Sequence, residues 1–323
     1  PPPPPPPPPP LFTDPPPTEL YTQVNSSAAS DVYKRQGLLG VNDRAGEELV
    51  DVIIFSRNDA DSAMRVLRSV EAHGLAITRG VFRGGHDPWP LLPAMSCDVF
   101  LSAEPSQVLK AREHGVSAAL ILPGARLSAD DVTEVRVAFD GDAVLFDPAS
   151  QQVYDHQGLD AFHEHEAARA EEPMSPGPFR PFLEGLARIQ AHFGETSPVR
   201  TALVTARAAP AHYRVVNTLR AWGVNVDETY FLGGVDKTAV LRAFGAHFFF
   251  DDQRVHAERA ANTVPAAQVL WSEADLPPAE APSEPAVVTG KGKGRAKARA
   301  RKPATPRAAK RPAAPRARAR SER

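Results

Sequence analysis

The chain has 323 residues, of which 37 are Lys or Arg and 39 are Asp or Glu, so its formal net charge is −2. Its one cysteine, Cys97, excludes an internal disulfide, is typical of a reducing compartment, and lies in an apolar context that predicts a core residue. No run approaches the ~18 apolar residues of a membrane span, and no secretory signal is visible, so we expect a cytoplasmic protein. The length suits one large domain or two.

Residues 1–36 begin with ten prolines, followed shortly by three more at 15–17. Such a segment favours extended polyproline and cannot form a core. Residues 26–36 resemble translated adaptor or vector sequence more than protein. We therefore expect residues 1–36 to be disordered and non-native, and we exclude them from the predicted fold.

An internal repeat follows. Shifting the sequence by 149 positions places residues 52–121 on residues 201–270 without a gap. Residues 82–87 (FRGGHD) then meet residues 231–236 (FLGGVD). Because chance rarely preserves glycines, apolar runs and spacing together, the alignment indicates a duplication.

Both copies have the same order of expected elements. A short apolar strand ends in a hydroxyl residue, Ser56 or Thr205. It is followed by a helix, a short strand that ends in Gly-Gly, a second helix, and a strand of four or five apolar residues. Strands that alternate with helices at this spacing predict a parallel sheet covered by helices on both faces.

The two copies differ in their chemistry. In the second copy, a hydroxyl, an amine and two acids stand at Thr205, Lys237, Asp251 and Asp252. The same positions of the first copy hold Ser56, Pro88, Ser102 and Ala103. Because the scaffold is kept while the amine and both acids are absent, we expect the second copy to be the catalytic half.

Two acids, Asp140 and Asp142, directly follow an apolar run that ends at Phe139. If this run is a buried strand, both carboxylates leave its carboxyl end on one side, where open α/β sheets bind their ligands. Carboxylates so placed suit divalent metal binding and acid–base catalysis, although Asp-Gly-Asp is also ordinary turn chemistry. At the same shift, the counterpart of this strand would precede residue 1, so we expect the first copy to be truncated.

An insert separates Asp140 from Thr205, with roughly fifty residues more than a strand and a helix need. Residues 153–166 predict a helix, and residues 176–182 predict a turn into a second helix.

Several residues in and near the insert have two interpretations. His163, His165 and Glu166 could form a metal cluster, but their spacing does not put all three on one helical face, which favours solvated residues. Phe162 could stack on a base or pack in a core. Arg207 could contact substrate or form a surface ion pair.

The segment from Lys291 to Arg323 is a basic tail with fourteen Lys or Arg and one acid, a net charge of +13. The rest of the chain then has 23 basic and 38 acidic residues, a net charge of −15. A tail of this composition is expected to be disordered. Counterion release would let it bind nucleic acid weakly and with strong salt dependence, and a solvated tail without a partner is the alternative.

Four motifs stand in order along the chain: Asp140-x-Asp142, Thr205 after a strand, Lys237 at a helix start, and Asp251-Asp252 after an apolar run. This order resembles the haloacid dehalogenase-like superfamily of phosphatases. The sequences of residues 138–146 (AFDGDAVLF) and 231–237 (FLGGVDK) are similar to those of the cytosolic type I 5′-nucleotidases. The resemblance to this family extends over roughly residues 46–271. The resemblance implies an α/β fold with a Rossmann-like parallel sheet of the haloacid dehalogenase-like type, a degenerate N-terminal repeat of the same half-fold and a small helical cap.

The resemblance also implies roles for the motif residues. Asp140 would attack phosphorus and form an aspartyl-phosphate, which splits one difficult displacement into two easier ones. Asp142 would act as general acid and then as general base. Thr205 and Lys237 would bind the phosphoryl oxygens.

The cofactor implied by the resemblance is Mg²⁺, since a carboxylate and a phosphate dianion repel and oxygen ligands suit this hard ion. Asp140, the backbone carbonyl of Asp142, and Asp251 would hold it. Asp252 would anchor the loop or the outer shell of the metal. In this superfamily an insert at residues 148–200 forms a cap over the site, where Phe162 and Arg207 are candidates for contacts with the substrate.

The chain then divides into four expected parts. These are the non-native segment 1–36, a truncated degenerate repeat at 37–130, a catalytic domain at 131–276 with its cap insert at about 148–200, and a disordered basic tail at 277–323.

The expected function is Mg²⁺-dependent hydrolysis of a nucleoside 5′-monophosphate, such as AMP or IMP, to nucleoside and phosphate. One alternative is the same chemistry on another small phosphate ester. The other is a nucleic-acid-associated protein that is recruited by its tail and has a vestigial core. The sequence predicts neither the oligomeric state nor an effector.

Overall fold

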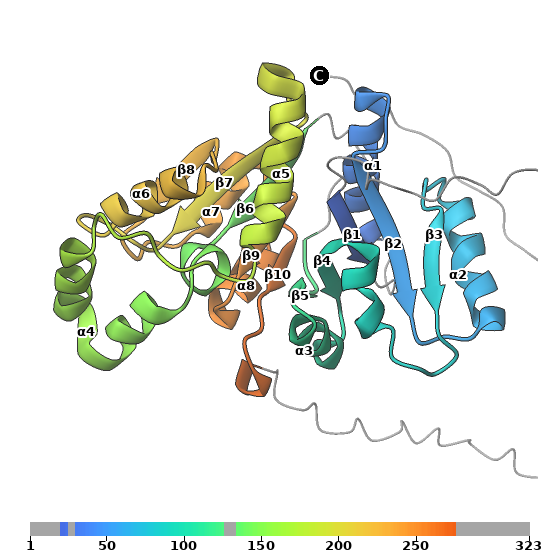
Figure 1. Cartoon of the computed structure of the whole chain (residues 1–323), viewed down its shortest axis with the longest axis horizontal. Coiled ribbons are helices and arrows are strands. Elements are labelled where there is room, and N and C mark those ends of the chain that lie inside the picture. Colours follow the sequence, from blue (N-terminus) through green and yellow to red (C-terminus); the bar gives the residue numbers. More distant parts are fainter. Residues whose placement is uncertain (1–19, 25–29, 126–133, 276–323) are drawn as a thin grey trace, which may run out of the picture. The chain divides into compact units, whose positions relative to one another are not determined.

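The computed structural model describes residues 20–24, 30–125 and 134–275, which all belong to one compact unit spanning residues 1–277. The strands of these residues form a single sheet in the order β3-β2-β1-β4-β5-β10-β9-β6-β7-β8 (Figure 1). The basic tail and the nucleic-acid binding expected of it lie outside the described residues.

The strands are β1 (Leu20–Val24), β2 (Val50–Ser56), β3 (Arg79–Phe82), β4 (Cys97–Ser102), β5 (Ser117–Ile121), β6 (Val135–Phe139), β7 (Val199–Thr205), β8 (Glu228–Phe231), β9 (Phe248–Asp251) and β10 (Ala266–Gln268). The helices are α1 (Ser30–Ala45), α2 (Ala60–Ala72), α3 (Pro105–Glu113), α4 (Ala149–Ala168), α5 (Arg180–Phe193), α6 (His212–Trp222), α7 (Thr238–Phe244) and α8 (Arg254–Ala261). Within the described part of the chain, none of these helices has the length and apolarity to cross a membrane.

The sheet consists of two halves with the same strand order. Strands β3-β2-β1-β4-β5 and strands β8-β7-β6-β9-β10 are each parallel within their half. The halves meet where β5 pairs antiparallel with β10. Shifting β2 and β3 by 149 positions reproduces the bounds of β7 and β8. The predicted α/β class with a mostly parallel sheet is therefore confirmed.

Strand β1 corrects two expectations about the start of the chain. Residues 20–24, which we excluded from the fold, pair with both β2 and β4, and residues 30–36 begin α1. In the first half β1 occupies the place that β6 occupies in the second, so this strand is not missing. The shift of 149 hid it because the connection from β1 to β2, residues 25–49, is much shorter than the connection from β6 to β7, residues 140–198.

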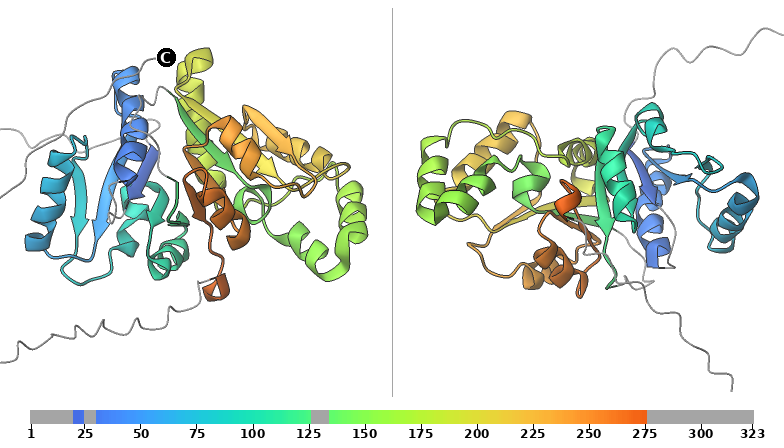
Figure 2. Two further views of the ribbon diagram at one scale, coloured as in Figure 1. Left: turned by 180° about the vertical axis from the view of Figure 1, so that it is seen from behind. Right: turned by 90° about the horizontal axis from the view of Figure 1, so that it is seen from below.

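Helices cover both faces of the sheet (Figure 2). Successive side chains of a strand point to opposite sides, and here the side chains on both sides are apolar and need to be buried. Phe139 and Leu203 pack in a core with side chains of α5 and α6. Their neighbours Ala138 and Ala202 pack in a second core with α7 and α8. In the first half, Cys97 is buried in an apolar cluster, as predicted.

Part of the insert between β6 and β7 packs on the sheet. Helix α5 packs on the sheet, with the ring of Phe182 5.9 Å from the rings of Phe139 and Phe250. The range 148–200 expected for the cap thus includes a helix that packs on the sheet, because an amphipathic helix such as α5 can face a sheet as well as a site, and the cap itself stays a prediction. Helix α4 stands apart from the sheet in Figure 1 and is broken at Gly158, where φ is +85°.

Candidate active site

The carboxyl ends of β6, β7 and β9 bring three expected site residues together. Asp140 follows the last residue of β6, Thr205 ends β7, and Asp251 ends β9. Because β6 lies between β7 and β9 in a parallel arrangement, these ends share one edge of the sheet. All three residues are buried, with exposures of 5%, 1% and 0%.

Lys237 joins the site from the N-terminus of α7. Its Nζ lies 2.9 Å from an oxygen of Asp140 and 2.7 Å from an oxygen of Asp251. Although burial disfavours the charged ammonium, the two carboxylates raise the pKa of Lys237 above its ordinary value. The lysine is therefore a permanent positive charge beside the expected nucleophile.

The loop after β6 leaves little room for a side chain at position 141. A Cβ there would lie 3.2 Å from Oγ1 of Thr205 and 3.3 Å from the ring of Phe146, closer than most real contacts. The backbone N–H of Gly141 donates to a carboxylate oxygen of Asp140 at 2.7 Å. This bond sets the orientation of the Asp140 carboxylate.

Asp140, Asp251 and Asp252 form an acidic cluster in which one carboxylate oxygen from each lies within 4.8 Å of the others. Burial is the main cause that raises the pKa of Asp140 to about 7 and of Asp252 to about 8, and the neighbouring carboxylates add to it. Oδ1 of Asp252 is buried without a hydrogen-bond partner. An all-oxygen donor set with an unpaired oxygen fits a hard divalent cation.

The side chain of Asp142 lies outside that cluster. Its carboxylate accepts two hydrogen bonds from Arg207, from Nε at 2.8 Å and from Nη2 at 2.6 Å. The expected metal contact of Asp142 was its backbone carbonyl, which stays a prediction.

Two interpretations of the residues near the insert are wrong. Arg207 forms a buried ion pair rather than a surface one, since only 3% of the residue is exposed. Glu166 is fully buried and bonded to Arg207 and Arg214, so it is not a solvated residue of the insert. The ring of Phe162 is buried, with the guanidinium carbon of Arg207 5.3 Å from its centroid, which favours packing over base stacking.

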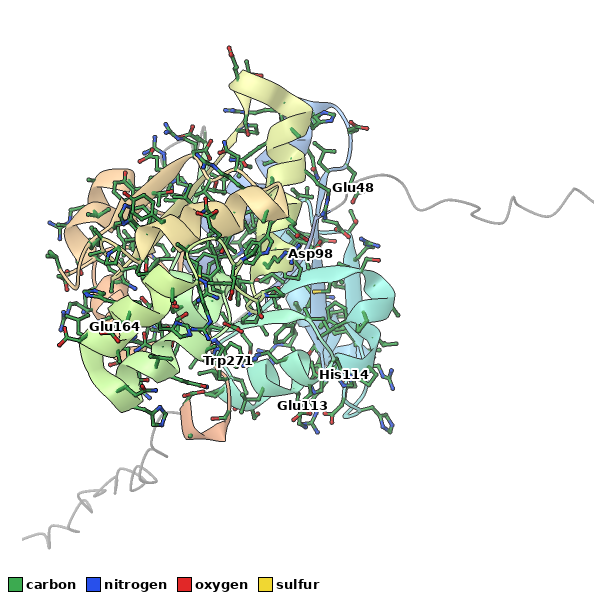
Figure 3. All side chains as sticks on the ribbon, turned by 60° about the vertical axis from the view of Figure 1, so that its left-hand side comes forward. Glu48, Asp98, Glu113, His114, Glu164 and Trp271 are labelled. Carbon is green, nitrogen blue, oxygen red and sulfur yellow. The ribbon has the colours of Figure 1, made fainter. Side chains whose placement is uncertain are left out.

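Sequence reasoning missed two further contacts of the site. Arg214, on α6, is buried and donates from Nη1 to Glu166 at 2.9 Å. Trp271, labelled in Figure 3, donates from Nε1 to the backbone oxygen of Ala143 at 2.7 Å. Arg112 of the first half lies 4.5 Å from the Trp271 ring, so this ring connects α3 with the catalytic loop.

The acidic cluster predicts how stability depends on pH without metal. The folded-state pKa values of Asp140 and Asp252, about 7 and about 8, exceed the ordinary 3.8. Stabilisation present below about pH 4 is therefore lost as the pH rises toward 8, on the order of a few kcal/mol. Urea unfolding in chelator at acidic and at alkaline pH measures this loss. Asp252→Asn is expected to reduce it, and a wild type equally stable at both pH values would contradict the assignment.

The fold and the site define a class of protein. A Rossmann-like, mostly parallel sheet with carboxylates after β6 and β9, a hydroxyl at the end of β7 and a buried lysine is the haloacid dehalogenase-like arrangement. Over residues 28–275 the chain matches the 5′-nucleotidase family, and it belongs to that family.

A curated relative supports the assignment and confirms the resemblance found in the sequence. The chain is 38% identical over 220 residues to cytosolic 5′-nucleotidase 1B of Homo sapiens. This match covers 66% of the chain and 36% of the relative, so the chain spans about a third of the length of that protein.

Two solved structures are similar at a low level. A chain of the Pnkp1/Rnl/Hen1 complex has a TM-score of 0.28 and 14% identity, and the match covers 79% of this chain and 97% of that one. Histidinol dehydrogenase from Elizabethkingia anophelis has a TM-score of 0.21 and 10% identity, with 77% and 52% covered. Scores this low carry no argument about fold or function.

Proposed function

We propose that this chain hydrolyses nucleoside 5′-monophosphates to nucleoside and phosphate, with AMP or IMP as the substrate. The observation that carries the proposal is the placement of Asp140, with its carboxylate next to Lys237 and within the acidic cluster at the end of β6. Membership of the 5′-nucleotidase family supports the nucleotide as substrate.

The proposed reaction has two steps. First, an Asp140 oxygen bonds to phosphorus while the bond from phosphorus to the ribose oxygen breaks, and that oxygen takes a proton from Asp142. Then Asp142 takes a proton from water, and the water oxygen displaces Asp140 and releases phosphate. Thr205 and Lys237 bind the phosphoryl oxygens and stabilise their charge.

We assign Mg²⁺ to the acidic cluster. Asp140, the backbone carbonyl of Asp142, and Asp251 would hold it, and Asp252 would anchor the loop or contact the outer shell. When bound, the cation would offset the repulsion between these carboxylates and the phosphate dianion.

Within this proposal, residues 131–276 are the catalytic domain, with α4 as the cap that selects the substrate. Residues 37–130, extended by β1 and α1, are the degenerate repeat.

We also propose a cytoplasmic location, in keeping with the name of the curated relative, which fractionation of cells would test. Binding of nucleic acid by the basic tail stays a prediction of the sequence, and salt-sensitive binding lost on deletion of residues 288–323 would support it.

A phosphate-release assay with purified protein and Mg²⁺ tests the function. We expect nucleoside 5′-monophosphates to be hydrolysed at least about tenfold more efficiently than sugar phosphates, because a site that binds the base as well as the phosphate gains binding energy that a sugar phosphate cannot supply. A preference for a sugar phosphate would replace the proposed substrate but keep the chemistry. No release from any phosphate ester would contradict both.

A further inference from the structure

We propose that Glu166, on the cap helix α4, is a positioning residue that holds Arg207 against Asp142 and thereby orients the Asp142 carboxylate for proton transfer to the leaving group. The inference rests on the proposed function, because it takes from there the role of Asp142. The inference goes beyond the proposed function because it adds a residue of the cap helix to the groups that support proton transfer.

The contact between Arg207 and Asp142 is a fork. Nε and Nη2 of Arg207 reach different oxygens of the carboxylate, at 2.8 and 2.6 Å. A planar guanidinium bound through two nitrogens fixes both the position and the plane of its partner, which a single hydrogen bond does not. The orientation of Asp142 therefore depends on where the Arg207 guanidinium is held.

Glu166 holds that guanidinium from the other side. Its Oε2 accepts from Nη1 of Arg207, the nitrogen that the fork leaves free. Its Oε1 accepts from Ser150 at 2.8 Å, from Arg214 at 2.9 Å, and contacts Nδ1 of His165 at 3.0 Å. Glu166 is thus anchored by its own helix and by α6, and it connects both with the loop of Asp142.

The charges in this cluster balance. Asp142 and Glu166 are faced by Arg207 and Arg214, and all four residues are buried. Although burial disfavours the charged form, Arg207 and the Ser150 hydroxyl keep the pKa of Glu166 below its ordinary value. Glu166 is therefore a carboxylate at neutral pH, and its negative charge holds the Arg207 guanidinium in place.

The first half of the chain is an internal comparison. At the shift of 149, Arg207 corresponds to Asn58 and Arg214 corresponds to Arg65, and both counterparts are exposed. In the described part of the connection between β1 and β2, residues 30–49, α1 is the one helix. The first half thus folds without this buried cluster. Among the described residues, the cluster occurs in the second half, which also has the expected catalytic carboxylates.

The test compares two substrates in the Glu166→Gln variant. A nucleoside is a poor leaving group that needs a proton, whereas p-nitrophenolate leaves without one, so only the nucleotide depends on a well-placed Asp142 in the first step. The ratio kcat/KM reports that step. We expect kcat/KM for the nucleotide to fall about 10- to 100-fold and kcat/KM for p-nitrophenyl phosphate to change less than about twofold.

The matched control is Glu164→Gln, which removes an exposed carboxylate two residues away on the same helix (Figure 3). We expect both substrates to keep their wild-type values. An equal loss on both substrates in Glu166→Gln, or no loss on either, would overturn the proposal, since the first outcome is that of a merely structural residue.

If Glu166→Gln does not fold, Arg207→Lys gives the same test, because a lysine keeps the charge but cannot form the fork. The selective loss is expected again, and an equal loss on both substrates would overturn the proposal. The two proposals fail in different proteins. If the proposed function is wrong, the wild type itself does not hydrolyse nucleotides. If the wild type hydrolyses another alkyl phosphate, that ester replaces the nucleotide in the comparison with p-nitrophenyl phosphate.

Discussion

Replacing Asp140 with Asn is expected to lower phosphate release from a nucleoside 5′-monophosphate by at least about 10⁴-fold, because the loss of the nucleophile removes the covalent step. An amide has the shape of the carboxylate, but its single oxygen can accept from only one of the two donors, Gly141 or Lys237, and it does not attack phosphorus. The measurement is kcat with saturating Mg²⁺. Because an Asn before Gly141 can deamidate back to a carboxylate, the mass of the variant is checked alongside.

The same variant separates catalysis from folding. Burial among other carboxylates raises the pKa of Asp140 to about 7, so its charge opposes folding at alkaline pH. The metal-free Asp140→Asn protein is therefore expected to be at least as stable as the wild type at pH 8. Asp155→Asn, in an exposed residue of α4, is the control that keeps full activity. More than about 1% of wild-type kcat in intact Asp140→Asn would exclude the nucleophile role.

The residues at the ends of β6, β7 and β9 could be predicted from the sequence because each follows an apolar run. In a parallel sheet, chain order and the alternation of helices are enough to bring such ends to one edge. Asp140, Thr205 and Asp251 therefore lie where the motifs placed them. Lys237 could be predicted as well, because it stands at the start of a helix and the helix begins at that edge of the sheet.

The cluster around Glu166 could not be predicted in the same way. Arg214 bonds to Glu166 across 48 positions of the chain, and this contact depends on how α4 folds back onto α6. The local spacing of His165 and Glu166 carries no information about that packing. The burial of Arg214 is a result of the structure, because the apolar positions of α6 do not place it on the inner face, and a buried charge needs a partner.

Strand β1 was missed for another reason. Residues 20–24 contain Tyr, Thr and Val, which favour strands, but they stand beside a proline-rich segment whose composition dominated the interpretation. The structure gives them neighbours on both sides, so the first half has the same five strands as the second. The two halves therefore share their strand order and differ in their chemistry.

Removing divalent metal with excess EDTA is expected to reduce phosphate release to background, and added Mg²⁺ is expected to restore it. Three carboxylates converge within 4.8 Å, while the nearby Lys237 supplies a single positive charge. Binding a phosphate dianion next to them would be opposed by several like charges in a buried site, where such repulsion is strong. The lysine alone does not offset this repulsion, and a divalent cation does.

The matched variant is Asp251→Asn, which removes one carboxylate from the cluster while the amide can still accept from Gln253. Its activity is expected to need at least about tenfold more Mg²⁺ for half-saturation, since a ligand charge is lost. Glu258→Gln, in an exposed residue of α8, is expected to titrate like the wild type. Full turnover in excess EDTA would contradict the assignment of a metal. Lys237 and Thr205 would then have to bind the phosphate unaided. The pKa values of Asp140 and Asp252, about 7 and about 8, would allow this only below about pH 7, where both carboxyls are mostly protonated.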